Sequence, residues 1–230
     1  MLSRTLRAAA VLALLAAATA AHAQAAKYTI KEAKTEPPKE LKPAVAKLLD
    51  DAAVQLLDGK GTLICEVWFR KGVPAKATPE QIKNGITLRE IPETTVLGAL
   101  RVHKTMIDYR KQKIKEGVYT LRLAYQPSDG DHMGTAPNNE FLLVSPAAED
   151  KDPAPMKEAK ELQELSTKAT GTSHPGVFLL FPAKDPGESP KLLSMPGKHW
   201  VLTQRLNVAT KNERAMLILG LALIGTSSAA

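Results

Sequence analysis

Alternation of apolar and polar residues is the dominant pattern of this chain, and it predicts a protein built from β-strands. The clearest case is residues 118–125, in which one face carries Tyr119, Leu121, Leu123 and Tyr125. A period of two is what a strand with one buried face requires. Similar runs predict further strands at 28–32, 53–57, 62–70, 94–102, 107–114, 141–144, 177–181 and 200–208.

Two of these runs form a predicted β-hairpin. The segments 53–57 and 62–70 flank the turn sequence Asp58-Gly59-Lys60-Gly61, and a glycine-containing turn between apolar runs is typical of a hairpin. In the second run Cys65, Val67 and Phe69 share one face, whereas Trp68 lies on the other, so we expect both faces to be partly covered. Residues 107–114 are predicted to form an edge strand because their basic side chains discourage pairing with other molecules.

Three segments between the strands have helix-like patterns. A helix is expected within 42–49, and another is expected to run from the capping residue Thr78 through Pro79 to Lys83. The segment 157–168 predicts a surface helix docked by the narrow stripe of Leu162 and Leu165. The proline-rich stretches 146–156 and 182–196 are predicted to be loops.

The apolar run at residues 215–225 supports two interpretations. It is too short to cross a bilayer as a helix, which takes about 20 residues. A central strand that is buried on both faces explains a continuous apolar run of this kind. The alternative is a membrane or envelope association through this segment.

Together the elements predict a mainly β protein. Many short strands, frequent turns and little helix favour an antiparallel β-sandwich with one or two short surface helices. The expected organisation is a signal peptide at 1–23, an extended N-terminal segment at 24–43 and a single β-sandwich domain at 44–226.

The N-terminal 23 residues have the three parts of a secretory signal peptide. Arg4 and Arg7 precede an apolar run at 8–18, and Ala21-His22-Ala23 provides small residues for cleavage after Ala23. The mature protein is therefore expected to be secreted or periplasmic, with no stable membrane span once the signal is removed.

Charge and cysteine content exclude some functions. Without the two signal-peptide arginines, the net charge falls from +7 to +5, and the charged residues are scattered. This pattern favours a solvated surface over nucleic-acid binding. Cys65 is the single cysteine, so no intrachain disulfide can form, and a small core thiol is expected.

The densest polar cluster follows the clearest strand, at residues 126–135. Its Asp129, Asp131 and His132 carry the carboxylate and imidazole donors that bind divalent metals. The same Asp-Gly and Gly-Thr steps also occur in ordinary turns, and the spacing lacks the EF-hand pattern. Both interpretations therefore stay open, and the remaining histidines show no metal-binding spacing.

Other candidate chemistry is sparse. Trp68 is a candidate sugar-stacking platform, with a core role as the alternative. The chain contains no G-x-S-x-G element, no S-x-x-K with a credible partner and no glycine-rich phosphate loop. We therefore expect no catalytic activity and no resident cofactor, apart from the divalent metal considered above.

A resemblance supports this picture. The relevant elements are the strand 117–122, Gln126-Pro127, the loop 129–135 and the strand 140–143. They resemble secreted bacterial proteins of uncharacterised function, and they are similar to DUF2911, a bacterial domain family of unknown function. In that family a "pAGtYsL" strand, here 116–121, follows a Trp-containing strand, here that of Trp68. The resemblance spans about residues 62–145, lacks a W-R-x-G-A-N element, and implies a β-sandwich without an assigned activity.

The sequence therefore predicts an exported, non-catalytic β-sandwich protein that acts as a binding or structural module. The alternative is a divalent-metal or carbohydrate-binding module that uses the loop of Asp129, Asp131 and His132, with Trp68 as a further ligand-binding candidate. Expected partners are components of the cell envelope or polysaccharides, and not nucleic acids.

Overall fold

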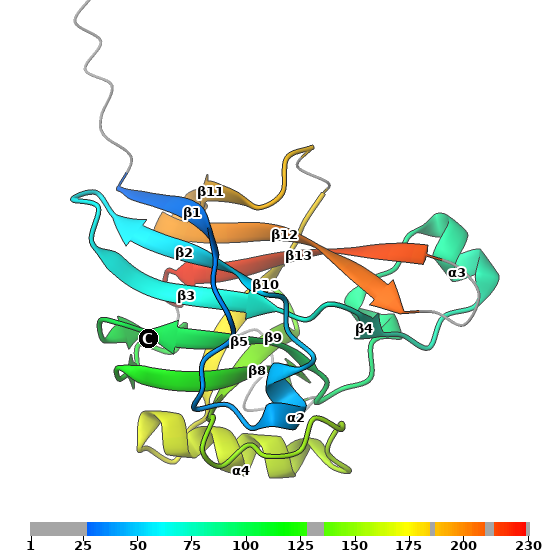
Figure 1. Ribbon diagram of the computed structural model, residues 1–230, viewed down its shortest axis with the longest axis horizontal. Helices are drawn as coiled ribbons and strands as arrows, with labels where there is room; N and C mark the ends of the chain where they lie inside the picture. The colour runs from blue at the N-terminus through cyan, green and yellow to red at the C-terminus, as the bar shows by residue number, and fades with distance from the viewer. Residues whose placement is uncertain (1–26, 128–135, 185–186, 210–213, 229–230) are drawn as a thin grey trace, which may run out of the picture.

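A single curled β-sheet dominates the protein. The computed structural model describes residues 27–127, 136–184, 187–209 and 214–228, and within them eleven strands form one sheet with the shape of a half-barrel (Figure 1). The mainly β, antiparallel-rich character predicted from the sequence is confirmed. The predicted sandwich is not confirmed, because the strands follow one continuous hydrogen-bonded path instead of dividing into two stacked sheets.

The strand order along this path is nearly sequential for most of the chain. It begins with β1 (Tyr28–Lys34), β2 (Ala52–Asp58), β3 (Leu63–Phe69), β5 (Val96–Val102), β8 (Gly117–Tyr125), β9 (Glu140–Pro146) and β10 (Gly176–Pro182). It then continues through β13 (Arg214–Ile224), β12 (His199–Ala209) and β11 (Lys191–Met195). All these neighbours are antiparallel, whereas the short strand β4 (Val73–Pro74) pairs with β12 in parallel.

The concave face of the sheet encloses the main core. Alternate residues of each strand point inward, as the period of two requires. Val67 on β3, Leu121 on β8 and Leu202 on β12 are at most 2% exposed and belong to one apolar cluster. The buried Cys65 thiol belongs to the same cluster, and burial raises its pKa. The predicted core role of this cysteine is therefore confirmed.

The convex face is covered by separate segments of chain. The stretch that contains helix α2 (Pro43–Ala46) lies over β3 and β5, where Val45 and Leu49 join the cluster that contains Trp68. The Trp68 Nε1–H donates to the Thr35 carbonyl at 3.0 Å. Beside it, Gly98 allows β5 to approach β3, because a Cβ at that position would lie 2.5 Å from the Trp68 carbonyl oxygen.

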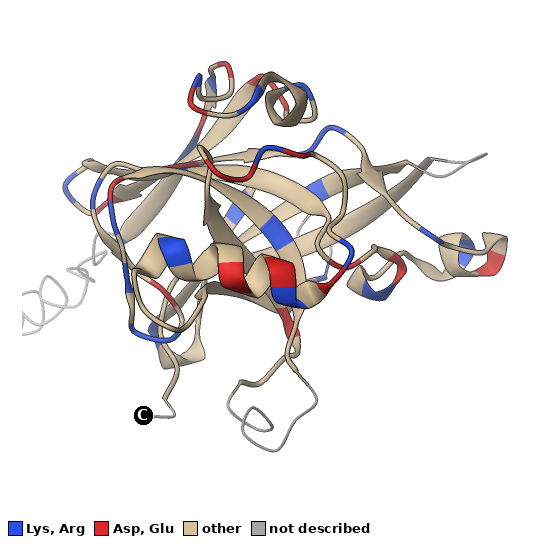
Figure 2. Cartoon of the chain, turned by 90° about the horizontal axis from the view of Figure 1, so that it is seen from below, with Lys and Arg blue, Asp and Glu red and all other residues tan. Residues whose placement is uncertain are grey.

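Helix α4 (Ala159–Thr170) covers the convex side of β8, β9 and β10. Its buried stripe is formed by Leu162, Ser166 and Ala169, so Ser166 joins Leu162 in place of the predicted Leu165. The Ser166 hydroxyl donates to the Val144 carbonyl at 2.6 Å and accepts from the Gly176 N–H at 3.0 Å. Charged residues occupy other faces of the helix (Figure 2).

A buried ion pair closes the same convex face. Arg122 of β8 is 0% exposed and binds Asp150 through Nε at 2.7 Å and through Nη2 at 2.8 Å. Its other N–H groups donate to the backbone carbonyls of Thr94, Asp152 and Ala154. The loop that follows β9 is thereby fastened across the strands.

Two predicted elements differ from the structure. Residues 107–114 form a small hairpin of β6 (Met106–Ile107) and β7 (Lys113–Ile114), not an edge strand. The Asp108 carboxylate, which accepts from the N–H groups of Gln112 and Val177, holds its turn. The proline-rich stretch 182–196, predicted to be a loop, contains the edge strand β11.

Several other predictions are confirmed. Helix α3 (Pro79–Asn84) is capped by the Thr78 side chain, which accepts from the Gln81 N–H. The C-terminal apolar run forms β13, which lies between β10 and β12 as a central strand. Its residues Leu219–Leu223 are buried. Two short 3-10 helices, Leu88–Glu90 and Pro196–Lys198, complete the described elements.

Candidate functional site

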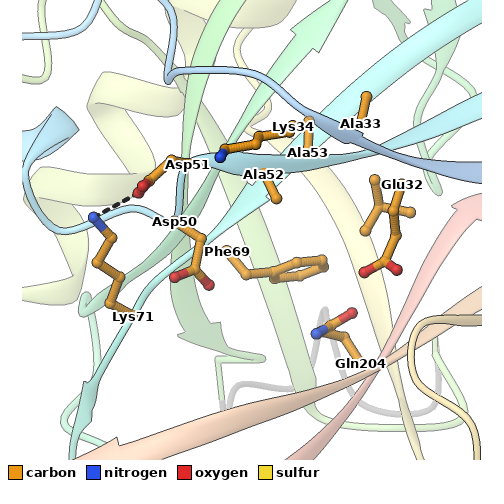
Figure 3. A pocket seen from close by; sticks show the side chains of 11 residues that line it. Glu32, Ala33, Lys34, Asp50, Asp51, Ala52, Ala53, Phe69, Lys71 and Gln204 are labelled. Atoms are coloured by element: carbon orange, nitrogen blue, oxygen red, sulfur yellow. Dashed lines mark ion pairs between the residues drawn. The ribbon is translucent and has the colours of Figure 1, made fainter.

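A hollow of about 640 Å³ opens at one end of the half-barrel, between β1 and β12. We call it the β1–β12 hollow. Its lining comes from the end of β1, the start of β2 and the two residues before it, the end of β3 and Lys71 beyond it, and the middle of β12 (Figure 3). The lining residues are Glu32, Ala33, Lys34, Asp50, Asp51, Ala52, Ala53, Val54, Phe69, Lys71 and Gln204.

The hollow lies where inward-facing positions change from apolar to polar. On β1, Tyr28 and Ile30 pack against the main core, and Glu32 follows in the same alternation. On β12, Leu202 and Leu206 belong to that core, and Gln204 lies between them. Alternate residues of a strand share a face, so Gln204 interrupts the apolar face of β12, and Glu32 is an exposed residue at the point where the alternation of β1 ends.

The side chains of Glu32, Asp50 and Gln204 surround an aromatic floor. Figure 3 shows the Phe69 ring between the carboxylates of Asp50 and Glu32, with the Gln204 amide close to it on the β12 side. Among the described residues, Glu32 and Asp50 accept no hydrogen bond and form no ion pair. Both residues are exposed, so solvent reaches these carboxylates, whereas the Phe69 ring between them is 4% exposed.

Gln204 carries a buried oxygen without a hydrogen-bond partner among the described residues. Its Nε2 donates to the Arg205 carbonyl at 3.1 Å, whereas its buried Oε1 has no hydrogen-bond partner among the described residues. A buried carbonyl without a donor costs free energy, about 1–3 kcal/mol. Such a group is unusual in a well-packed interior, and because this oxygen is itself buried, it is not open to a ligand in the hollow.

Both lysines of the hollow interact with Asp51. Lys71 Nζ lies 2.8 Å from Asp51 Oδ1, and this hydrogen bond lowers the pKa of the Asp51 carboxyl. The positive charge of Lys34 lowers the same pKa further. Asp51 is thus the paired carboxylate of the site, whereas Asp50 and Glu32 are left for an external partner.

Asp50 is electrostatically unlike its neighbour. Partial burial raises the pKa of its carboxyl, and the negative charge of Asp51 raises it further, while Lys71 opposes both effects. A raised pKa means that the charged form is destabilised. A cation bound beside Asp50 would relieve this cost.

None of the site residues predicted from the sequence lines the β1–β12 hollow among the described residues. Asp129, Asp131 and His132 lie outside the described residues, so the structure does not place the predicted metal and ligand loop. Trp68 is described and lies in the interior, where it is 2% exposed. Its ring packs in the cluster beneath α2, and its N–H is used by the Thr35 carbonyl. The core role considered for Trp68 therefore matches its position.

Another polar group lies on the convex face, away from the hollow. Glu66, 8% exposed, accepts from Gln55 Nε2 at 2.9 Å and contacts His103 Nε2 at 2.7 Å. These contacts satisfy the carboxylate within the sheet. Across the described ranges, no three His, Cys, Asp or Glu side chains are grouped so that they could hold a metal ion.

Part of the hollow is marked in the amino-acid sequence. Gln204 within the run Leu202–Leu206 and Glu32 after Tyr28 and Ile30 are polar residues in an apolar alternation. Asp50 and Phe69 carry no such signal, because only the curl of the sheet brings the start of β2 and the end of β3 to β12.

Comparisons give no outside guide to this site. No family model, curated protein or solved structure matches the chain. In the part of the chain that is described, no helix has the length and apolar character needed to cross a membrane.

Proposed function

We propose that the protein is an exported, non-catalytic binding module that takes an organic cation, an ammonium or guanidinium group, into the β1–β12 hollow. The observation that supports this most directly is the pair of donor-free carboxylates, Glu32 and Asp50, on either side of the Phe69 ring. The volume of about 640 Å³ lies within the range of small-molecule sites. The export part of the proposal depends on the N-terminal segment 1–23, which lies outside the described residues.

The chemistry of the lining favours a cation over an anion. Carboxylates only accept hydrogen bonds, so their partner must donate. Charge-assisted hydrogen bonds to ammonium or guanidinium groups are stronger than those between neutral groups. With Asp51 paired to Lys71, the remaining charges of Glu32, Asp50 and Lys34 sum to −1 and suit a single positive charge.

Neutralising either carboxylate should weaken this binding. For Glu32→Gln and Asp50→Asn, we expect the affinity for arginine methyl ester to fall about tenfold or more each, because each loses a charge-assisted hydrogen bond. Isothermal titration calorimetry of the purified protein measures the change. Glu116→Gln is the matched control, since Glu116 is exposed in the turn before β8 and should leave the affinity unchanged.

The same measurement across pH gives an independent check. Asp50 attracts a cation only when it is ionised, and its pKa is raised by burial. Binding should therefore weaken as pH falls through that raised pKa, earlier than an ordinary aspartate would cause. The curves of the wild type and the D50N variant should converge at low pH. Equal affinity of wild type, E32Q and D50N at neutral pH would contradict the proposal.

A metal- or carbohydrate-binding role for the loop of Asp129, Asp131 and His132 is the alternative proposal from the sequence. If the loop binds a divalent ion, the purified protein should carry metal at near one equivalent, and His132→Ala should remove most of it, because an imidazole ligand is lost. Elemental analysis after dialysis measures both. Metal-free wild-type protein would eliminate the metal version, and a glycan array tests the carbohydrate version.

A further inference from the structure

We infer that the cation is presented by an extended peptide, which adds a strand to the free edge of β1 and inserts one Arg or Lys side chain into the β1–β12 hollow. This inference rests on the proposed function and specifies the ligand class. Its basis is the position of the hollow, which lies beside an unpaired strand edge instead of on a closed surface.

Strand β1 is the end of the hydrogen-bonded path, and its residues Glu32–Lys34 border the hollow. All of β1 pairs with β2 on one side, from Tyr28↔Asp58 to Lys34↔Ala52. Backbone N–H and C=O groups of a strand alternate between its two sides. Within Glu32–Lys34, some of these groups therefore point away from β2 and toward the hollow, where no described strand pairs with them.

The opposite border of the gap is also interrupted. Strand β11 pairs with β12 only as far as Thr203, the Ser189 hydroxyl accepts from the Arg205 N–H at 2.8 Å, and β4 joins β12 only at Val208 and Ala209. The segment of β12 between these partners contains Gln204. At the other end of β1, the Tyr28 ring meets the Trp200 ring of β12 at 5.3 Å between centroids. Strand β1 also contacts β11 without pairing with it. The sheet thus approaches closure at Tyr28, whereas Glu32–Lys34 border the hollow.

An added strand would pair with the edge of β1 and place a side chain in the β1–β12 hollow. Peptides bind exposed sheet edges through main-chain hydrogen bonds, and pockets for alternate side chains give the specificity. A strand beside β1 sends every second side chain inward. The inward side chain nearest Glu32 would enter the site of the two donor-free carboxylates, and this charge complementarity selects Arg or Lys for that position.

The test uses four capped probes and the full-length wild-type protein. They are the pentapeptide Val-Thr-Arg-Thr-Val, the same peptide with citrulline for arginine, the same peptide N-methylated at both threonines, and acetylarginine N-methylamide. We expect the first to bind about tenfold more tightly than the single residue, because it adds main-chain hydrogen bonds. N-methylation should remove that gain, and citrulline should remove most of the binding.

The outcomes separate this inference from the proposed function. If all arginine probes bind equally, strand addition is overturned while cation binding stands. If no probe binds, both fail. If the citrulline peptide binds as well as the arginine peptide, the link between the edge and the hollow is overturned. Hydrogen exchange supplies a second readout: the arginine peptide should slow amide exchange within Glu32–Lys34 and leave Glu116 unchanged, and unchanged exchange at β1 would contradict strand addition.

Discussion

Replacing Asp150 by alanine should destabilise the protein by about 3–5 kcal/mol, because it leaves the fully buried guanidinium of Arg122 without its counter-charge. Arg122 is 0% exposed and Asp150 is 2% exposed, so water does not substitute for the lost carboxylate. Urea unfolding followed by circular dichroism measures the change as a lower midpoint with an unchanged slope.

Two further variants define the origin of that loss. Asp152 lies in the same loop, but its exposed carboxylate accepts only from the Ala154 N–H, so Asp152→Ala should cost less than about 1 kcal/mol. The double variant Arg122→Met with Asp150→Leu should be more stable than Asp150→Ala alone, since no buried charge is left unpaired. An Asp150→Ala protein as stable as Asp152→Ala would show that the ion pair does not fasten the loop.

Trp68→Ala should have a comparable effect, a loss of about 3–5 kcal/mol, because it opens a cavity between β3 and the segment that contains α2. The side chain is 2% exposed and packs with Val45, Leu49 and Ala99. Thermal and urea unfolding both measure this loss, and the N-terminal segment should become more sensitive to proteolysis.

Trp68→Phe distinguishes packing from hydrogen bonding at this position. Phenylalanine keeps most of the apolar volume but leaves the Thr35 carbonyl without its donor, so we expect a smaller loss of about 1–2 kcal/mol. If Trp68→Ala were as stable as the wild type, the ring would not belong to the core, and the sugar-platform interpretation of Trp68 would regain support.

The sequence predicts the individual strands of this protein better than it predicts how they assemble into one curled sheet. Alternation over 118–125 and 62–70 identifies β8 and β3 because each strand has one face in a continuous core. The unbroken apolar run at 215–225 identifies a central strand for the same reason. Whether strands divide into two sheets or curl into one depends on pairings such as Leu180↔Leu221, between residues far apart in sequence, and a period of two carries no information about them.

Strand β11 shows a second limit of pattern analysis. The sequence Lys191–Met195 lies within a proline-rich stretch, and it forms a strand because it pairs with residues 199–203 of β12. The small hairpin at 106–114 is similar, since the buried carboxylate of Asp108 organises its turn. In both cases tertiary contacts decide the conformation, and the local composition favours a different one.

The candidate site likewise contains residues that the sequence marks and residues that only the fold brings there. Glu32 and Gln204 interrupt apolar alternations, so the sequence alone marks them. Asp50 and Phe69 join them only because the sheet curls, and the sequence does not specify that curvature. The loop of Asp129, Asp131 and His132 stays a prediction, because it lies outside the described residues.

The position of β13 also constrains the order in which the molecule can be assembled. β13 comes last among the described strands, yet it pairs with both β10 and β12, so it links the β11–β12 hairpin to the rest of the sheet along the main hydrogen-bonded path, with the short β4 as a second link to β12. A chain emerging from its N-terminus cannot complete the sheet until residues near Ile224 are available. Until then the edge of β10 remains unpaired and open to non-native association. A chaperone would therefore protect the chain most before β13 has been synthesised.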